Sequence, residues 1–183
     1  DPERTPERAR TLDFADLLAP PPPGPRRCLK AQDPPGPGLD GEMTDAARPA
    51  IEAGQSVVIE RPVRNVHRAV GTFLSGEVVR RHGAKGLPDG AIRLRLKGSA
   101  GQSLGAFLAP GIEIRVEGDA NDYLGKGLSG GRIVVVPPAG SGLGVSDNVI
   151  AGNTILYGAT SGEVFLAGTA GERFAVRNSG ADA

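Results

Sequence analysis

Short runs of alternating apolar and polar residues recur at a nearly constant interval through the second half of the chain. The five runs are residues 91–97 (AIRLRLK), 112–117 (IEIRVE), 132–136 (RIVVV), 154–157 (TILY) and 173–177 (RFAVR). Such alternation is typical of half-buried β-strands. The steps between their apolar anchors are 20, 21, 22 and 19 residues, taking Ile92, Ile112, Ile133, Ile155 and Phe174. A period of about 20 residues is typical of one coil of a repeat solenoid.

The segments between these runs are rich in turn residues, such as GSAG at 98–101 and GDAND at 118–122. Glycine adopts positive φ readily, and Asn, Asp and Ser hydrogen-bond to their own backbone. Parallel strands can stack without crossover helices if the chain coils. We therefore expect a mainly β fold, a parallel β-helix with a single-stranded solenoid. An antiparallel β-sandwich stays open as the alternative, because residues 103–108 and 163–167 add further short runs.

The chain is expected to have three parts: a Pro-rich linker (1–39), a connecting segment with short helices (40–89) and a glycine-rich β-helix domain (90–183). Ten of the sixteen prolines lie in the first part, and proline fixes φ and removes a backbone donor. Residues 11–18 (TLDFADLL) interrupt that linker with a short apolar face. They predict a single helical turn, either docked on a neighbour or disordered.

Two helices and one strand are expected in the connecting segment. Residues 40–54 predict a short helix that Pro49 kinks or restarts and Gly54 ends, and residues 55–61 predict a strand. Residues 66–82 predict a longer helix with Asn65 as N-cap. Its apolar face has helical spacing and is formed by Val66, Val70, Phe73, Leu74 and Val78. Gly71 and Gly76 weaken this prediction by roughly 1 kcal/mol each relative to Ala, unless they permit close packing.

Composition narrows the class of protein. The 21 basic and 21 acidic residues cancel, so nothing indicates binding to nucleic acid or to an anionic membrane. Aromatic content is 4% without Trp, which predicts an aliphatic core. The single cysteine, Cys28, rules out an internal disulfide or a cysteine-only metal site within the chain. No signal or membrane-spanning segment is recognised, so a cytoplasmic location is expected.

Two glycine-rich motifs match catalytic patterns, but their context argues against both. Residues 125–130 fit G-x-G-x-x-G, yet a dinucleotide site needs a helix after the motif, and here a strand is predicted. Residues 127–131 fit G-x-S-x-G around Ser129, yet a nucleophile elbow also needs a following helix and a nearby histidine base. The only histidines, His67 and His82, lie in the predicted helical segment. Ser129 is interpreted as a turn residue.

Asp119, Asn121 and Asp122 form a polar turn whose spacing does not fit an EF-hand loop. We interpret them as side chains that cap backbone groups at a tight corner. Lys126 and Arg132 flank the glycines and could meet an anion, with a solvated face as the simpler interpretation. No catalytic, cofactor-binding or metal-ligating set is recognised.

Residues 118–136 (GDANDYLGKGLSGGRIVVV), preceded by 98–108 (GSAGQSLGAFL), resemble the C-terminal glycine-rich GXGXG domain of the glutamate synthase large subunit. The similarity extends over residues 47–54, 62–76, 148–153, 156–163 and 170–181. Together these segments cover most of residues 40–183. The structural motif carried by the resemblance comprises Gly98, Gly101, Gly105, Gly118, Asp119, Asn121, Asp122, Gly125, Gly127, Gly130, Gly131, Gly158 and Gly162.

The resemblance implies that the β-helix is right-handed and serves as an interdomain scaffold. The parent enzyme would move the amide nitrogen of glutamine onto 2-oxoglutarate and reduce the product to glutamate. The implied partners are an amidotransferase domain and an FMN synthase domain, with a small NAD(P)H-oxidising subunit as a further one. FMN and an iron–sulfur cluster are implied for the parent, and none of their residues is carried over here.

The chain starts at Asp1 and stops after a repeat-like unit, so we expect a fragment, inactive alone and truncated at the C-terminal end of the β-helix. The alternative function is a free-standing β-helix assembly subunit of another oxidoreductase complex, such as formylmethanofuran dehydrogenase.

Overall fold

The structure is a computed structural model that describes residues 12–24, 36, 38–142 and 144–183. The chain divides into two compact units, Asp1–Pro34 and Pro35–Ala183. In the first unit α2 (Ala15–Leu18) is the expected helical turn, and Asp13 accepts a hydrogen bond from the Ala15 N–H at 2.9 Å. Cys28 and much of the Pro-rich linker lie outside the described residues. The two alternatives for this turn, docked on a neighbour or disordered, both stay open.

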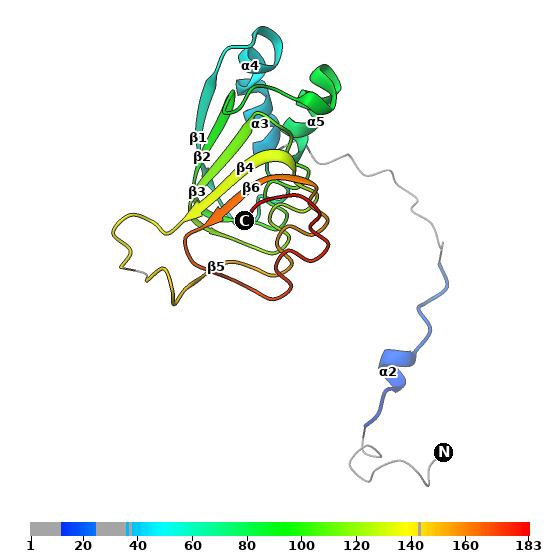
Figure 1. The fold of residues 1–183 in the computed structure, drawn as a ribbon. Helices are drawn as coiled ribbons and strands as arrows, with labels where there is room; N and C mark the ends of the chain where they lie inside the picture. Colours follow the sequence, from blue (N-terminus) through cyan, green and yellow to red (C-terminus); the bar gives the residue numbers. More distant parts are fainter. Residues whose placement is uncertain (1–11, 25–35, 37, 143) are drawn as a thin grey trace. The chain divides into compact units, whose positions relative to one another are not determined.

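The second unit is built on a parallel sheet (Figure 1). Its strands, in spatial order, are β1 (Val57–Val63), β2 (Ile92–Ala100), β3 (Ile112–Ala120), β4 (Ser129–Val136) and β6 (Ser161–Leu166). Every pairing between the described strands is parallel. The expected mainly β fold is confirmed, and the antiparallel sandwich is wrong.

The inward faces of these strands form an aliphatic core. Ile92 pairs with Ile112, Ile114 pairs with Ile133, and Ile133 pairs with Val164, so branched side chains stack from strand to strand. All five are at most 1% exposed. Full burial of such a side chain contributes about 1.5–3 kcal/mol. No aromatic residue belongs to the buried core of the described part of the chain, as the composition predicted.

Two of the five predicted strands are wrong. Residues 154–157 and 173–177 form turns. The strand that follows residues 154–157 is β6, which overlaps the alternative run 163–167. Thr154, Leu156, Arg173, Ala175 and Arg177 all have φ between 57° and 60°, a left-handed conformation that no β-strand contains. The register also corrects one anchor, because Ile133 pairs with Ile114 and not with Ile112.

These segments belong to a stack of turns that we call the turn ladder, comprising residues 103–108, 123–128, 154–159 and 173–178. In each segment the first, third and fifth residues have positive φ. Backbone hydrogen bonds join the segments: Phe107 donates to the Lys126 carbonyl at 2.8 Å, and Gly125 donates to the Leu104 carbonyl at 2.9 Å. Consecutive segments of the turn ladder are therefore bonded to each other.

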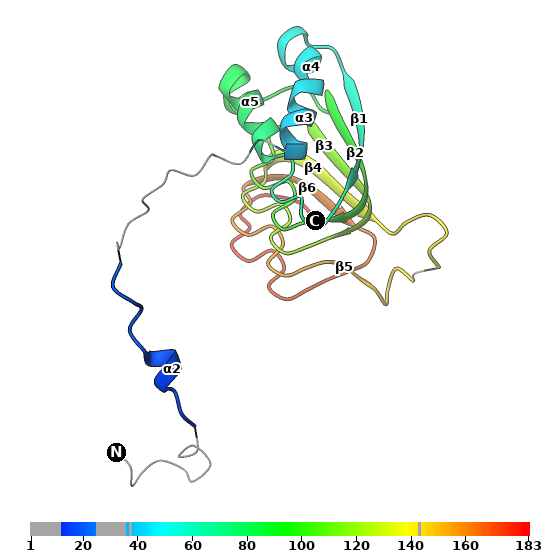
Figure 2. The same cartoon turned by 180° about the vertical axis from the view of Figure 1, so that it is seen from behind.

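Three helices gather near the β1 end of the sheet, as both views show (Figures 1 and 2). They are α3 (Gly38–Ala46), α4 (Arg48–Ala53) and α5 (Thr72–His82), with the 3-10 turn η1 (Gly83–Lys85) after α5. Pro49 lies in the first turn of α4, and Gly54 ends α4 with φ of 68°. The predicted restart and stop are confirmed.

The longer helix begins at Thr72 and not at Val66. Ala69 and Gly71 have φ of 52° and 91°, which stops a right-handed helix from starting earlier. The segment before α5 is hydrogen-bonded to the turn ladder, since the Val70 carbonyl accepts a hydrogen bond from the Gly105 N–H at 2.8 Å. Asn65 caps no helix, and its side-chain oxygen accepts a hydrogen bond from Asn121 at 3.0 Å.

A buried carboxylate from α3 caps the start of α5. Asp40 accepts hydrogen bonds from the Gly71 N–H at 2.9 Å and the Phe73 N–H at 2.7 Å. It is 8% exposed, and burial raises its pKa although the backbone donors act in the opposite direction. Asp40 thus joins two helices and satisfies donors that a helix start leaves free.

The coil between β4 and β6 is longer than its neighbours. Ile133 pairs with Val164, 31 residues later, whereas Ile92 pairs with Ile112. The extra chain projects as a loop, and its residues 139–142 and 144–147 are exposed (Figure 1). The short strand β5 (Val149–Ala151) then returns to pair with β3 and with β7 (Thr169–Ala170). No helix within the described residues is long and apolar enough to cross a membrane.

Candidate functional site

The glycine-rich motif connects two neighbouring strands of the sheet. β3 ends at Ala120, the turn-ladder segment follows, and β4 starts at Ser129. A strand therefore follows residues 125–130, where a dinucleotide site or a nucleophile elbow needs a helix. Ser129 is the first residue of β4, and its hydroxyl donates to the Leu108 carbonyl at 3.2 Å. The interpretation of Ser129 as a turn residue is corrected accordingly.

Several motif glycines lie where a side chain would strike the adjacent coil. A Cβ on Gly118 would come 2.0 Å from the Gly98 carbonyl oxygen, and one on Gly98 would come 2.3 Å from that of Val63. Contacts under 3 Å with other coils would also arise at Gly101, Gly105, Gly127, Gly130, Gly131 and Gly162. At Gly125 the nearest atom lies 3.1 Å away, and Gly158 faces open space. Most of the motif thus permits close coil-to-coil packing.

The polar motif residues bond to the backbone and to each other. Asn121 accepts a hydrogen bond from the Asp122 N–H at 2.7 Å, and Asp122 accepts one from the Asn153 N–H at 2.7 Å. Asp119 instead accepts one from the Ser99 hydroxyl at 2.9 Å. The capping interpretation is confirmed for Asn121 and Asp122. Within the described ranges no three His, Cys, Asp or Glu side chains are grouped to hold a metal ion.

The remaining candidates are separated in the structure. His67 accepts a hydrogen bond from the Arg64 N–H at 3.1 Å, whereas His82 contacts the Ile51 carbonyl at 2.7 Å. Lys126 lies 5.8 Å from the centre of the Tyr123 ring, within cation–π range. Arg132 pairs with Glu163 at 2.5 Å and with Glu113 at 3.7 Å. The structure brings none of these cations together at one anion site.

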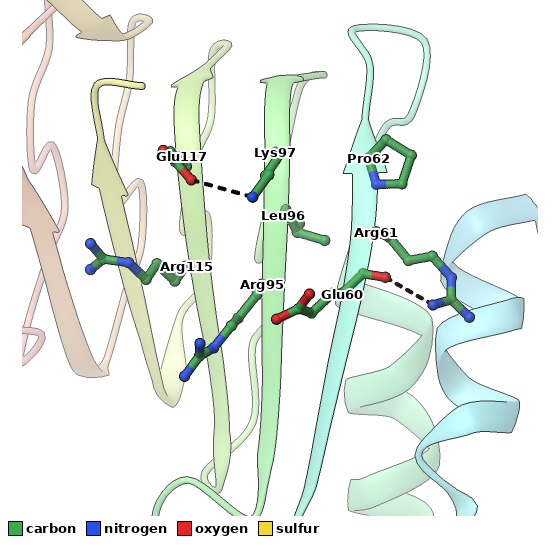
Figure 3. Close-up of a pocket in the computed structure, with 8 residues that line it drawn as sticks. All are labelled: Glu60, Arg61, Pro62, Arg95, Leu96, Lys97, Arg115 and Glu117. Carbon is green, nitrogen blue, oxygen red and sulfur yellow. Dashed lines mark hydrogen bonds and ion pairs between the residues drawn. The ribbon is translucent and has the colours of Figure 1, made fainter. Parts of the chain in front are cut away.

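A depression lies on the outward face of β1, β2 and β3 (Figure 3). It encloses about 540 Å³ and is lined by Glu60, Arg61, Pro62, Arg95, Leu96, Lys97, Arg115 and Glu117. Four of these side chains are basic and two are acidic. Lys97 and Glu117 are 4.0 Å apart, and Arg61 donates to the Glu60 carbonyl at 2.8 Å. The face therefore carries an excess of positive charge.

Cross-strand register sets which outward side chains are neighbours on this face. Arg93, Lys97 and Ser99 of β2 lie opposite Glu113, Glu117 and Asp119 of β3, respectively. Each of these three pairs is complementary in charge or hydrogen bonding. The fourth outward pair places Arg95 opposite Arg115. Sequence reasoning missed this pair, although its 20-residue spacing equals the predicted coil length.

Comparison with known proteins shows which family the chain belongs to. The GXGXG motif family matches residues 40–183. The chain belongs to this family. It is 57% identical over 143 residues to the glutamate synthase [NADPH] large chain of Azospirillum brasilense, covering 78% of this chain and 9% of that relative. It is 52% identical over 143 residues to the glutamate synthase [NADH] of Schizosaccharomyces pombe, covering 78% of this chain and 7% of the relative.

A third relative, the glutamate synthase [NADPH] large chain of Bacillus subtilis, is 50% identical over 135 residues, or 74% of this chain and 9% of the relative. The resemblance read from residues 40–183 is confirmed by these matches. The chain spans less than a tenth of the length of the three relatives. The names of two of these relatives mention NADPH, and the name of the third mentions NADH.

Proposed function

We propose that this chain is the interdomain scaffold of a glutamate synthase that forms glutamate from glutamine and 2-oxoglutarate. The observation that carries the proposal is the identity of 57% to a glutamate synthase large chain over 143 residues. The matched region contains the stacked strands and the turn ladder, so the relatives would contain the same framework. FMN and an iron–sulfur cluster would be held by other parts of the parent protein. For the cluster this follows from the single cysteine here, which cannot ligate one.

The architecture of the second unit supports a scaffolding role. Strands β1, β2, β3, β4 and β6 stack in parallel on one side, and the turn ladder joins the coils on another. We propose that this arrangement is a right-handed parallel β-helix over residues 90–183, with residues 40–89 as its connecting segment. Each coil is bonded through two separate hydrogen-bond ladders, which resists bending of the stack.

A rigid stack would keep an amidotransferase domain and an FMN synthase domain at a fixed separation. Ammonia released from glutamine could then reach the second active site without escaping to solvent. The motif glycines are the positions through which the stack can be disturbed, because a Cβ on Gly127 would come 2.5 Å from the Phe107 ring and one on Gly130 would come 2.5 Å from Pro110.

The test compares nitrogen transfer in the full-length parent protein with and without changes at these glycines. Gly127→Val and Gly130→Val are expected to release free ammonia and to lower the glutamate formed per glutamine consumed. Gly158→Ala is the matched control, since Gly158 faces open space. Folded Gly127→Val and Gly130→Val proteins that still transfer all the nitrogen would show that the scaffold proposal is wrong.

A further inference from the structure

The outward face of the sheet contains one row in which like charges are directly opposed. This row, which we call the 95–115 row, runs in register through Glu60, Arg95, Arg115, Val134 and Phe165. Both arginines are exposed, and no ion pair involves either of them within the described part of the chain. Glu60 lies beside Arg95 on the neighbouring strand (Figure 3).

The pairing of Arg95 with Arg115 lowers the stability of the isolated fold. Neighbouring strands lie about 4.8 Å apart, and like charges directly opposite each other destabilise a sheet. The other outward β2–β3 pairs avoid this conflict, since Lys97 faces Glu117 and Ser99 bonds to Asp119. A destabilising pair among complementary ones points to a role outside folding, because two adjacent guanidinium groups form a strong receptor for carboxylates.

The other half of the row is apolar. Val134 is partly buried, and Phe165 is 52% exposed although it extends from a central part of the β4–β6 pairing. Arginine and exposed aromatic residues on the same surface are typical of the energetically important part of a protein interface. A small free anion would use only the arginines, whereas a protein segment can use both halves of the row.

We infer that the 95–115 row is a docking surface for a protein segment that presents carboxylates to Arg95 and Arg115 and an apolar side chain to Phe165. The inference rests on the proposed function for the expectation that other domains or subunits adjoin this chain. Charge complementarity determines the chemistry of the partner: Asp or Glu side chains positioned beside an apolar residue.

The first experiment places a photoreactive benzoylphenylalanine at Phe165 in the full-length parent protein, which preserves an aromatic ring at that position. Mass spectrometry of the cross-linked peptides is expected to find a segment with Asp or Glu close to the attachment point. The double variant Arg95→Glu/Arg115→Glu should lower the cross-link yield by about tenfold or more. Arg81→Glu is the charge-reversal control away from the row, because Arg81 is exposed on α5 and has no ion pair within the described residues.

Changing the identified acidic residue to Arg in the double variant should restore the cross-link. Failure to cross-link, or a yield that charge reversal leaves unchanged, would overturn the inference. Glutarate that binds the wild-type chain and abolishes the cross-link would also overturn it, in favour of a small dicarboxylate ligand. Cross-linking reports contact and the glycine variants report nitrogen transfer, so the inference and the proposed function can fail separately.

A stability measurement separates docking from a structural role. Arg115→Glu places a carboxylate opposite Arg95, which converts a repulsive pair into a complementary one. The inference therefore expects an unchanged or higher melting temperature together with a lower cross-link yield. A melting temperature that falls while the cross-link persists would show that the arginines serve the fold and would overturn the docking role.

Discussion

Gly118→Ala tests whether the close approach of neighbouring coils depends on glycine. Gly118 pairs with Gly98 in the parallel ladder, and its φ is 153°. A Cβ there would lie 2.0 Å from the Gly98 carbonyl oxygen. That contact involves backbone atoms, so no side-chain rotation can relieve it and β2 and β3 would have to separate.

The expected loss follows from two contributions. An unfavourable backbone conformation costs about 1–3 kcal/mol, and forcing an extra methyl into a packed region costs about 1–3 kcal/mol. Gly118→Ala should therefore lower the free energy of unfolding by about 2–6 kcal/mol, a large share of the roughly 5–15 kcal/mol typical of a folded domain.

Equilibrium unfolding in urea gives the measurement, with Gly158→Ala as the control. Gly158 has φ of 65° but no atom within 4 Å of a built Cβ, so only the left-handed conformation is penalised, by about 1–2 kcal/mol. Equal losses for the two variants would refute the reasoning, because the backbone contact at Gly118 would then contribute nothing.

Three further outcomes are expected. Asp40→Ala should lower the free energy of unfolding by about 1–3 kcal/mol, since the Gly71 and Phe73 donors lose their buried acceptor; urea unfolding checks this, and wild-type stability would contradict it. Burial raises the folded-state pKa of Asp40. The free energy of unfolding of the wild type, relative to that of Asp40→Asn, should therefore fall as pH rises from the unfolded-state pKa through the folded-state pKa. Unfolding curves at a series of pH values measure this difference, and a difference that does not change with pH would contradict the prediction. Gly76→Ala should raise the free energy of unfolding by about 0.5–1 kcal/mol, because Gly76 lies in α5 with open space around it; a loss of stability would indicate a missed contact.

The alternation of apolar residues predicted β2 and β3 well. β2 begins at Ile92 and β3 at Ile112, each within one residue of the predicted start, because one face of these strands is buried and the other is solvated. The same alternation failed at residues 154–157. In the turn ladder, residues with positive φ also recur at every second position, so its sequence resembles that of a strand.

The start of α5 and its cap were not predictable from local signals. Asp40 lies 31 residues before Gly71, and no helix-start pattern connects residues so far apart. Packing around Gly71 explains why it is glycine, because a Cβ there would come 2.9 Å from the Ile114 side chain. Gly76, by contrast, faces open space, so the close-packing explanation is wrong for that position. The division into linker, connecting segment and β-helix domain stays a prediction.

The loop between β4 and β5 lengthens one coil without shifting the register of the strand that follows it. Val164 still aligns with Ile133 although 31 residues intervene, because residues 139–142 and 144–147 extend outward. A fluorescent label or a small inserted protein at Gly140 would therefore leave the alignment of the later coils unaltered. This loop therefore offers an attachment point that lies outside the stacked strands and the turn ladder.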